Sequence, residues 1–340
     1  MRVGIVGTGF MGRTHAAAWS HTPATIAGYI SKRTASSEVL IEKYGGKSYP
    51  DLAELLSDVD IVDICSPTHL HYEMVLEAAA AGCDIICEKP IARTLAQAQE
   101  MITACTEAGV KFFVAHVVRF FPEYAAAKAK VQSGEIGQPA VIRLTRGTFQ
   151  PKKAIDNWFL DFEKSGGMML DLMIHDLDYA RWVAGEVDTV FARNIQHSHT
   201  DATVDHGLVI LQHTNGTISH IEGSWAYPAP LFRTRLEIAG SNGWINYDSE
   251  ETAAIGLHLH KHGREETPDV PLPSSPLSED PFTSQIRSAY NSIAGDLPIA
   301  VAGLDGAAAL QLALAAIESA SSGQPVRIEP LTGIKNVARS

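Results

Sequence analysis

The chain has few cysteines and a shortage of positive charge, and both restrict what it can be. Four of its 340 residues are cysteine (Cys65, Cys83, Cys87 and Cys105), and they contain no CxxC pair. Cys65 and Cys87 fall in apolar, strand-like runs, so buried free thiols are expected rather than metal ligands. Lysine and arginine number 27 against 39 aspartate and glutamate, a formal net charge of −12. That balance, without a basic cluster, argues against nucleic acid or an anionic membrane as a partner.

Long hydrophobic runs are also missing. No apolar stretch reaches the length of a membrane helix, and the opening residues MRVGIVGTGF lack the apolar core of a signal peptide. We therefore expect a cytoplasmic protein. The 45% hydrophobic and 19% charged composition is typical of a globular chain. Its 340 residues are too many for one ordinary core and suggest two domains.

Strand-like and helix-like segments alternate through the first 120 residues. Apolar runs occur at RVGIVG, TIAGYIS, VDIVDICSP, CDIICEKP and VKFFVAH. One intervening helix has a predicted N-terminal cap at Asp51, with Glu54 three residues later. The strands are continuously apolar, which indicates burial on both faces and a parallel sheet covered by helices. We place this doubly wound α/β domain at residues 1–121.

From Pro122 the pattern changes to longer β-like runs after one helix. The runs PAVIRLTRGTF, VDTVFARNIQH, DHGLVILQHT, GTISHIEGSWAY and RTRLEIAGSNGWINYD predict a mostly antiparallel sheet with helices on one face. HTNG and AGSNG are typical of hairpin turns, because Asn-Gly supplies positive φ angles. Residues 261–282 indicate an exposed loop, and a late helix is expected to end at Gly323. We assign this α+β domain to residues 122–340.

A glycine-rich turn follows the first predicted strand. Its pattern is Gly7-x-Gly9-x-x-Gly12, directly before a predicted helix. The glycines permit a tight turn and close backbone approach, while the helix N-terminus faces a pyrophosphate. The strand before, the helix after and the next strand together predict a dinucleotide site. Its expected contacts are Gly7, Thr8, Gly9, Phe10, Met11 and Gly12.

The second strand ends in GYISKRT, about twenty residues beyond the fingerprint, where NAD-binding chains usually carry an acidic residue. Here the residues are Ser31, Lys32 and Arg33. A hydroxyl and two cations suit the 2′-phosphate of NADP, and no carboxylate is present to repel it. We favour NADP over NAD; alternatively, Lys32 and Arg33 form a solvated surface pair.

The stretch SGGMMLDLMIHDLD places four ionisable groups among methionines and leucines. On one continuous helix, Asp171, His175 and Asp178 share a narrow face beside the apolar stripe. Asp176 points away from them and is expected to be solvated. A metal site, a catalytic base and a salt-bridged helix all fit this stretch. Lys89, at the end of the strand CDIICEKP, fits either a solvated tip or a cation facing a ligand cleft.

In this order, the segments resemble the glucose–fructose oxidoreductase, inositol dehydrogenase and MocA (Gfo/Idh/MocA) family over nearly the whole chain. The resemblance rests on the fingerprint, the Ser66-Pro67 turn, Glu88-Lys89-Pro90, the stretch RFFPEY, Gly166-Gly167 and the Asp171-x-x-x-His175 pair. It implies an N-terminal Rossmann domain and a C-terminal domain whose open sheet often mediates oligomer formation. A homodimer or homotetramer is therefore expected.

The resemblance also implies residue roles. It places Lys89 near the nicotinamide and the reacting hydroxyl, and Asp171 and His175 beside the substrate carbon. The turn SPTHLH, which follows the strand VDIVDIC, supplies cofactor contacts, and so does the EKP motif. The residues are Ser66, Pro67, Thr68, His71, Glu88 and Lys89. Thr68 departs from the asparagine of many relatives, so its contact is in doubt.

Two further residues fall where the resemblance implies substrate contacts or support for them. Trp158, with Asp156 before it, matches a position that lines the sugar site, although an isolated tryptophan also serves ordinary packing. Arg119 either braces the cleft or pairs with a carboxylate. Asp178 is interpreted as structural.

The chemistry of the residues agrees with these roles. Oxidation of a secondary alcohol needs a base for the hydroxyl proton, which suits His175, with Asp171 to orient its ring. The Lys89 ammonium can stabilise negative charge on the oxygen. We therefore expect an oxidoreductase of a sugar, inositol or related polyol, with NADP (or NAD) and no metal. Two alternatives stay open: a glycosidase that uses tightly bound NAD for a transient oxidation, and a non-enzymatic nucleotide-binding sensor.

Overall fold

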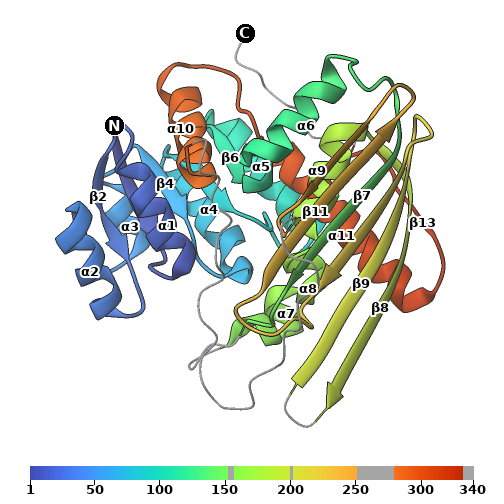
Figure 1. The fold of residues 1–340 in the computed structure, drawn as a ribbon. Coiled ribbons are helices and arrows are strands. Elements are labelled where there is room, and N and C mark those ends of the chain that lie inside the picture. Colours follow the sequence, from blue (N-terminus) through green and yellow to red (C-terminus); the bar gives the residue numbers. More distant parts are fainter. Residues whose placement is uncertain (152–156, 200–201, 251–278, 332–340) are drawn as a thin grey trace. The chain divides into compact units, whose positions relative to one another are not determined.

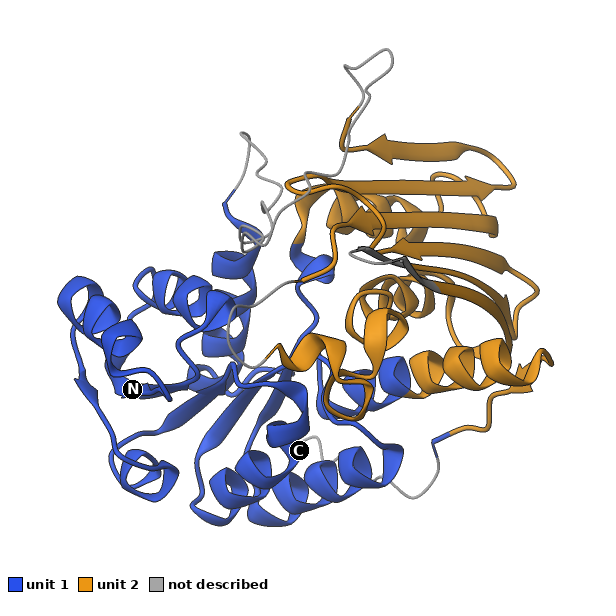
Figure 2. Cartoon of the chain, turned by 90° about the horizontal axis from the view of Figure 1, so that it is seen from below, with its two compact units in different colours: residues 1–120, 277–310, 331–340 blue, residues 121–276, 311–330 orange. Residues whose placement is uncertain are grey.

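A computed structural model describes residues 1–151, 157–199, 202–250 and 279–331 (Figure 1). The chain forms two compact units: unit 1 comprises residues 1–120, 277–310 and 331–340, and unit 2 comprises residues 121–276 and 311–330 (Figure 2). Residues 277–310 thus belong with the N-terminal unit, whereas the sequence predicted a single division between residues 121 and 122. Of the loop expected at 261–282, residues 261–278 lie outside the described residues, whereas residues 281 and 282 begin a helix and do not form a loop.

Unit 1 contains a six-stranded parallel sheet in the order β3-β2-β1-β4-β5-β6. The order reverses between β1 and β4, as in doubly wound sheets, and ligands bind at such reversals beyond the carboxyl ends of the strands. The predicted parallel sheet is confirmed. Its strands are β1 (Arg2–Val6), β2 (Thr25–Ile30), β3 (Lys47–Ser48), β4 (Ile61–Ile64), β5 (Asp84–Glu88) and β6 (Phe112–Ala115).

Helices form two groups of neighbours in unit 1: α2, α1 and α10 in one, and α3, α4 and α5 in the other. Asp51 caps α3 as predicted, since its carboxylate accepts a hydrogen bond from the Glu54 N–H at 2.9 Å. The helical segments are α1 (Phe10–Trp19), α2 (Thr34–Tyr44), α3 (Leu52–Leu56), η1 (Thr68–Leu70), α4 (His71–Ala80), α5 (Leu95–Ala108), η2 (Val117–Phe120) and α10 (Pro281–Ala294).

Unit 2 contains a seven-stranded sheet in the order β12-β11-β7-β10-β9-β8-β13. Among these described strands, only the β7–β10 pairing is parallel, which confirms the mostly antiparallel prediction. The strands are β7 (Pro139–Thr148), β8 (Val187–His199), β9 (Ala202–His213), β10 (Ile218–Ser224), β11 (Phe232–Gly240), β12 (Trp244–Asp248) and β13 (Val326–Arg327).

Both predicted hairpins of this sheet are present, but their turns differ. Gly216 has the expected positive φ of 90° between β9 and β10. Neither Asn242 nor Gly243 has a positive φ, so the expectation for the second turn was wrong. There the backbone closes differently: Gly240 N–H donates to the carbonyl of Gly243 at 2.8 Å.

One face of the sheet in unit 2 is covered by helices (Figure 1). Helix α8 contacts β9 and β10, and α9 contacts β7 and β10. Helix α11 begins in unit 1, continues in unit 2 and ends before Gly323, whose φ is 74°. The helical segments are α6 (Pro122–Gln132), η3 (Trp158–Leu160), α7 (Phe162–Ser165), α8 (Gly167–Asp171), α9 (Ile174–Ala184) and α11 (Gly303–Ser322). No helix among the described residues is long and apolar enough to cross a membrane.

Candidate functional site

The glycine loop joins β1 to α1 and leaves room for a ligand. Gly7 has φ +98°, and a Cβ on Gly12 would lie 1.8 Å from the Gly7 carbonyl oxygen, so neither position accepts a side chain. Apart from its chain neighbours, no atom lies within 4 Å of the place that a Cβ on Gly9 would take. A tight turn with one open glycine is the arrangement that lets a dinucleotide approach the backbone.

The other predicted contacts in this loop differ in exposure. Thr8 is buried, with 5% of its surface exposed, whereas Phe10 and Met11 are half-buried and Gly9 is exposed. A Cβ on Gly7 would lie 2.6 Å from the Cys65 carbonyl oxygen, so the loop lies directly against the chain that follows β4. The loop, therefore, is held by β4 and presents Gly9, Phe10 and Met11.

Ser31 is engaged within the protein. Its hydroxyl donates to the Arg33 carbonyl at 2.8 Å and accepts from the Arg33 N–H at 3.1 Å. The hydroxyl of Thr8 lies 2.5 Å from the same oxygen. Because the one Ser31 proton goes to Arg33, Thr8 is the donor in that contact. The end of β2 is thus tied to the glycine loop, and the side chains of Lys32 and Arg33 are exposed.

His71 joins the turns that follow β4 and β5. Its Nε2 lies 2.9 Å from the Ser66 carbonyl, and its Nδ1 lies 2.9 Å from the Pro90 carbonyl. His71 is 1% exposed and Thr68 is 2% exposed, whereas Ser66 and Pro67 are half-buried. The structure therefore gives His71 a bracing position, and cofactor contact by these four residues stays a prediction.

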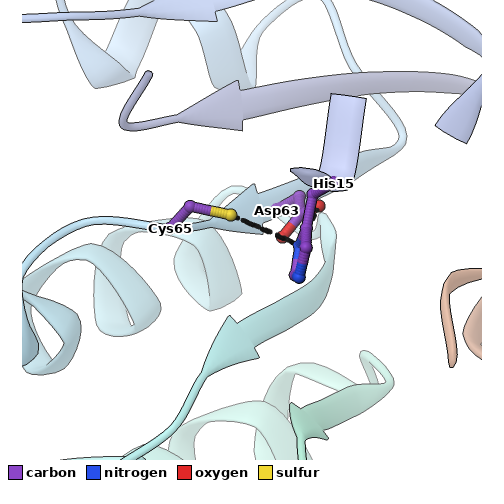
Figure 3. Close-up of side chains that lie close together, drawn as sticks. All are labelled: His15, Asp63 and Cys65. Carbon is purple, nitrogen blue, oxygen red and sulfur yellow. Dashed lines mark hydrogen bonds and ion pairs between the residues drawn. The ribbon is translucent and has the colours of Figure 1, made fainter. Parts of the chain in front are cut away.

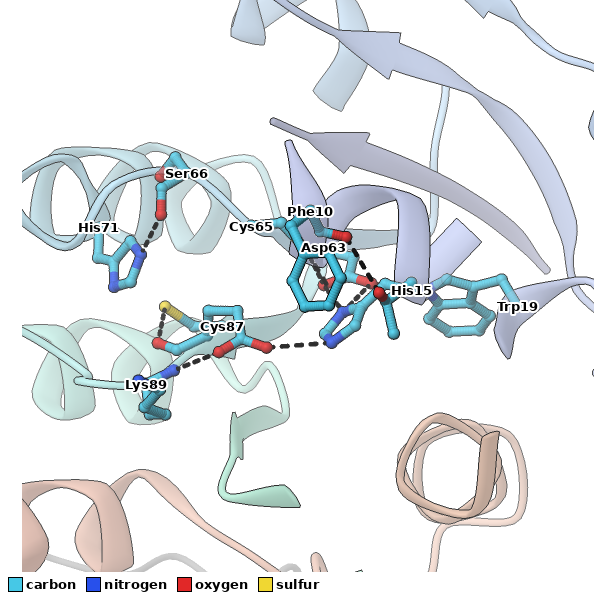
Figure 4. Close-up of polar contacts among 11 residues, drawn as sticks. Phe10, His15, Trp19, Asp63, Cys65, Ser66, His71, Cys87 and Lys89 are labelled. Atoms are coloured by element: carbon cyan, nitrogen blue, oxygen red, sulfur yellow. Dashed lines mark hydrogen bonds and ion pairs between the residues drawn. The ribbon is translucent and has the colours of Figure 1, made fainter. Parts of the chain in front are cut away.

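Lys89 follows the last residue of β5. Glu88 is 6% exposed, and its Oε2 accepts a hydrogen bond from the Lys89 N–H at 3.1 Å. Its other oxygen, Oε1, lies 3.1 Å from Nε2 of His15, the contact drawn in Figure 4. One oxygen of Glu88 thus contacts the Lys89 backbone, and the other contacts His15.

A buried polar cluster lies beneath the glycine loop: His15, Asp63 and Cys65 (Figure 3). Nδ1 of His15 lies 3.0 and 2.9 Å from the two Asp63 oxygens and 3.3 Å from Sγ of Cys65. Asp63 also accepts from Nε1 of Trp19 at 2.7 Å. Burial lowers the pKa of His15, but Asp63 and then Cys65 outweigh it and raise that pKa well above 6.5.

Sequence reasoning missed this cluster. The available signal was Asp63, a carboxylate inside a strand that is otherwise continuously apolar, since a buried charge requires a partner. The three residue types suit a metal ion, and one ligand atom from each lies within 4.8 Å of the others. Cys87 is a buried free thiol, as expected, and so are Cys83 and Cys105. Cys65, which was also expected to be buried, is a half-buried free thiol.

In unit 2, the segment Met168–Ala180 is buried except at Asp171 and His175, which are half-buried. The expectation of one continuous helix was wrong: α8 ends at Asp171 and α9 begins at Ile174. The N–H groups of both Leu172 and Met173 donate to the Met168 carbonyl, at 2.9 and 3.2 Å. One of these bonds spans five residues, so the backbone widens at this point.

Asp176 is not the solvated carboxylate that the sequence suggested. It has no exposed surface and accepts two hydrogen bonds from Arg146, Nε to Oδ2 at 2.7 Å and Nη2 to Oδ1 at 3.0 Å. Arg146 lies on the helix-covered face of β7, where it is 4% exposed. Asp178 is 1% exposed, consistent with its structural interpretation.

Arg119 and Trp158 each have a neighbour in their own unit. Nη2 of Arg119 lies 3.2 Å from Oδ1 of Asp305, so this arginine pairs with a carboxylate, one of its two expected roles. Trp158 stacks on Phe159, with ring centroids 4.0 Å apart. Contact of either with a substrate stays a prediction, and Asp156 lies outside the described residues.

The sequence-predicted site residues are thus distributed over the two units. The glycine loop, Ser31–Arg33, Ser66–His71 and Lys89 belong to unit 1, and Asp171 and His175 belong to unit 2. A doubly wound parallel sheet with a glycine fingerprint after its first strand defines the class of dinucleotide-binding proteins.

Comparison with known proteins identifies the family within this class. Residues 1–116 match the model described as "Oxidoreductase family, NAD-binding Rossmann fold", and residues 124–246 match "GFO/IDH/MocA C-terminal domain". The chain belongs to the Gfo/Idh/MocA family of oxidoreductases, as the sequence resemblance predicted.

Relatives match the chain over almost its whole length. It is 31% identical to myo-inositol 2-dehydrogenase of Thermotoga maritima, over 98% of this chain and 100% of that protein. It is 29% identical to inositol 2-dehydrogenase of Rhizobium meliloti, over 96% and 99%. The crystal structure of a probable dehydrogenase from Thermotoga maritima superposes with a TM-score of 0.81 at 29% identity, over 96% and 98%.

Proposed function

We propose that this protein transfers a hydride between a nicotinamide cofactor and a secondary alcohol or ketone of a cyclic polyol or sugar, with inositols first among the candidates. Two inositol dehydrogenases that match nearly the full chain support this substrate class. One structural observation carries the proposal. The buried segment Met168–Ala180 leaves only Asp171 and His175 accessible, a carboxylate and an imidazole suited to moving a proton.

The glycine loop fits a dinucleotide, because Gly9 is open and exposed where Gly7 and Gly12 are closed. Bound nicotinamide supplies the hydride acceptor or donor. In the oxidative direction, His175 would accept the hydroxyl proton as the hydride leaves the alcohol carbon for the nicotinamide and the ketone forms. Asp171 stabilises the charged imidazole, and the Lys89 ammonium stabilises negative charge on the reacting oxygen. In the reductive direction, His175 returns the proton.

We also propose that NADP is preferred over NAD. Asp or Glu at the end of β2 usually accepts the ribose hydroxyls of NAD. Here Ser31 occupies the position with its hydroxyl committed to Thr8 and Arg33. The exposed side chains of Lys32 and Arg33 are available to a 2′-phosphate, and arginine suits phosphate through its planar set of donors.

A homodimer or homotetramer assembled through the open sheet face of unit 2 completes the proposal. This face carries exposed apolar side chains on four of its described strands, namely Ile195 of β8, Leu208 of β9, Ile218 of β10 and Trp244 of β12. Exposed apolar surface of this kind marks association sites. Light scattering after size exclusion tests it, and a monomer at micromolar concentration would contradict it.

The experiment that tests the function combines nucleotide titration with turnover. Purified protein is titrated with NADPH and NADH by fluorescence, then assayed with myo-inositol and a panel of cyclic polyols and sugars at the nicotinamide absorbance. Single His175→Ala, Lys89→Ala and Asp171→Ala variants should lower turnover about 100-fold or more, with nucleotide affinity nearly unchanged.

His21→Ala is the matched control, because His21 is an exposed histidine just beyond α1 and belongs neither to the predicted site nor to the open sheet face. It should retain full turnover. Loss of nucleotide binding alone in the three variants would mean that their roles are misassigned. Nucleotide retained through purification, with no net absorbance change during turnover of a glycoside, would favour the transient-oxidation glycosidase instead.

A further inference from the structure

We propose that His15 is a positioning residue for Lys89: its ring lies between the buried carboxylates of Asp63 and Glu88 and fixes the end of β5 from which this lysine extends. The inference rests on the proposed function for the catalytic role of Lys89. It gives a structural role to His15, a residue of α1, the helix that follows the glycine loop.

The chain of contacts from His15 to Lys89 is short (Figure 4). Nδ1 of His15 faces the carboxylate of Asp63 at 2.9 Å, and Nε2 lies 3.1 Å from Oε1 of Glu88. Oε2 of Glu88 accepts the N–H of Lys89 at 3.1 Å. The Nε2 contact has the distance of an ion pair without the alignment of a hydrogen bond. His15 therefore links α1 to β4 and β5 through two opposite charges.

Burial makes these contacts consequential. His15 and Asp63 have no exposed surface, and Glu88 is 6% exposed. With both ring nitrogens protonated, the three groups carry one net negative charge, whereas a neutral ring leaves two carboxylates facing each other across it. Removing one partner from a buried set of charges leaves the others uncompensated, which is strongly unfavourable.

The surroundings of His15 keep it charged. Asp63 and Cys65 face it from β4 and the turn that follows, Glu88 faces it from β5, and the Phe282 ring approaches from α10 at 6.5 Å between centroids. Because both ring nitrogens lie within 3.1 Å of carboxylate oxygens, the cation is the form that the two carboxylates favour. Its loss releases Glu88 to rotate, and the Lys89 N–H then loses its acceptor.

The test reads Lys89 directly and needs neither substrate nor nucleotide. Lysines of the full-length protein are reductively methylated with ¹³C-formaldehyde, and the Lys89 NMR signal is assigned by its absence in Lys89→Arg. The signal and its pH titration are then compared in wild type, His15→Gln and Glu88→Gln. His21→Gln is the control, since His21 is an exposed histidine just beyond α1.

We expect His15→Gln and Glu88→Gln to shift the Lys89 signal and its titration midpoint, and His21→Gln to leave both unchanged. Misplacement of a reacting group by about 1 Å lowers turnover by about 100-fold. With an active substrate, kcat should therefore fall 10- to 100-fold, whereas nucleotide affinity in His15→Gln stays within about twofold. Because Glu88→Gln keeps the His15 ring and removes only the charge of its partner, it tests the same link if His15→Gln fails to fold.

Two outcomes would overturn the inference. A Lys89 signal and titration identical to wild type in both variants would limit His15 to packing. One equivalent of zinc in the purified protein, lost in both His15→Gln and Cys65→Ala, would instead assign the cluster to a metal site. If no polyol or sugar is turned over but the Lys89 signal responds as expected, the proposed substrate class fails and the positioning link stands.

Discussion

Arg146 and Asp176 are joined by two hydrogen bonds at 2.7 and 3.0 Å and are both closed to solvent. The pair connects β7 to α9, one residue beyond His175. Burial lowers the pKa of Arg146, but Asp176 outweighs it and raises that pKa, so the guanidinium stays charged. The position of His175 on the sheet therefore depends on a buried salt bridge.

Breaking this bridge should destabilise the protein strongly. Asp176→Ala leaves an uncompensated buried guanidinium, so we expect a loss of about 3–5 kcal/mol in the free energy of unfolding. Urea denaturation followed by tryptophan fluorescence measures it. Arg235→Ala is the control, because the Arg235–Asp248 pair leaves the arginine side chain 52% exposed and should contribute about 1 kcal/mol or less. Equal losses in both variants would contradict the assignment.

The glycines of the fingerprint should respond differently to alanine. A Cβ on Gly12 meets the Gly7 carbonyl at 1.8 Å, so Gly12→Ala should lower Tm by several degrees and abolish nucleotide binding. Gly9→Ala meets no atom of the protein and should leave Tm nearly unchanged while weakening nucleotide affinity. Thermal denaturation measures Tm and NADPH titration measures nucleotide affinity in both variants. Unchanged nucleotide affinity in Gly9→Ala would place the ligand elsewhere.

Nucleotide choice should change with the residue at the end of β2. Ser31→Asp introduces a carboxylate that accepts ribose hydroxyls and repels a 2′-phosphate. We expect NADPH affinity to fall at least about tenfold and NADH affinity to rise, as measured by fluorescence titration. Ser31→Ala removes the contacts with Thr8 and Arg33 without adding charge, so it should weaken both nucleotides alike. Unchanged NADPH affinity in Ser31→Asp would show that Lys32 and Arg33 face solvent.

Asp205 should make stability depend on pH. Burial raises its pKa from 3.8 to about 6. Between these values the folded protein binds more protons than the unfolded chain, so stability falls as pH rises through about 6. A shift of this size corresponds to at most about 3 kcal/mol. Tm measured from pH 4.5 to 8 should decline less in Asp205→Asn than in wild type, and parallel curves would refute the assignment.

Much of the fold follows from local pattern in the sequence. Continuous apolar strands predict the parallel sheet, and Asp51 with Glu54 predicts the start of α3. The Asn-Gly pair at Gly216 predicts the β9–β10 hairpin, because the positive φ of this turn depends on the turn residues themselves. The interruption at Leu172–Met173 has no such sign. Neither residue is a helix breaker, and apolar periodicity continues across the gap.

The partners of buried charges could not be predicted because they are distant in the sequence. No lysine or arginine stands next to Asp176 in the sequence, and its partner Arg146 lies 30 positions upstream on a strand. His15 and Asp63 are 48 positions apart and meet only because α1 packs beside β4. The side chains of the catalytic motif were found through the resemblance, whereas the groups that hold them in place required the structure.

Unit 1 cannot be completed early in synthesis, because residues 277–310 belong to it and are made long after residue 120. The Val114 N–H at the end of β6 donates to the carbonyl of Val301 at 3.0 Å, and α10 packs along α1. These partners leave the ribosome about 190 residues after Phe120, roughly 10–40 s later at ordinary elongation rates. Until then β6 lacks its last neighbour and α1 its cover. A fragment ending at Phe120 is therefore expected to expose apolar surface and require a chaperone.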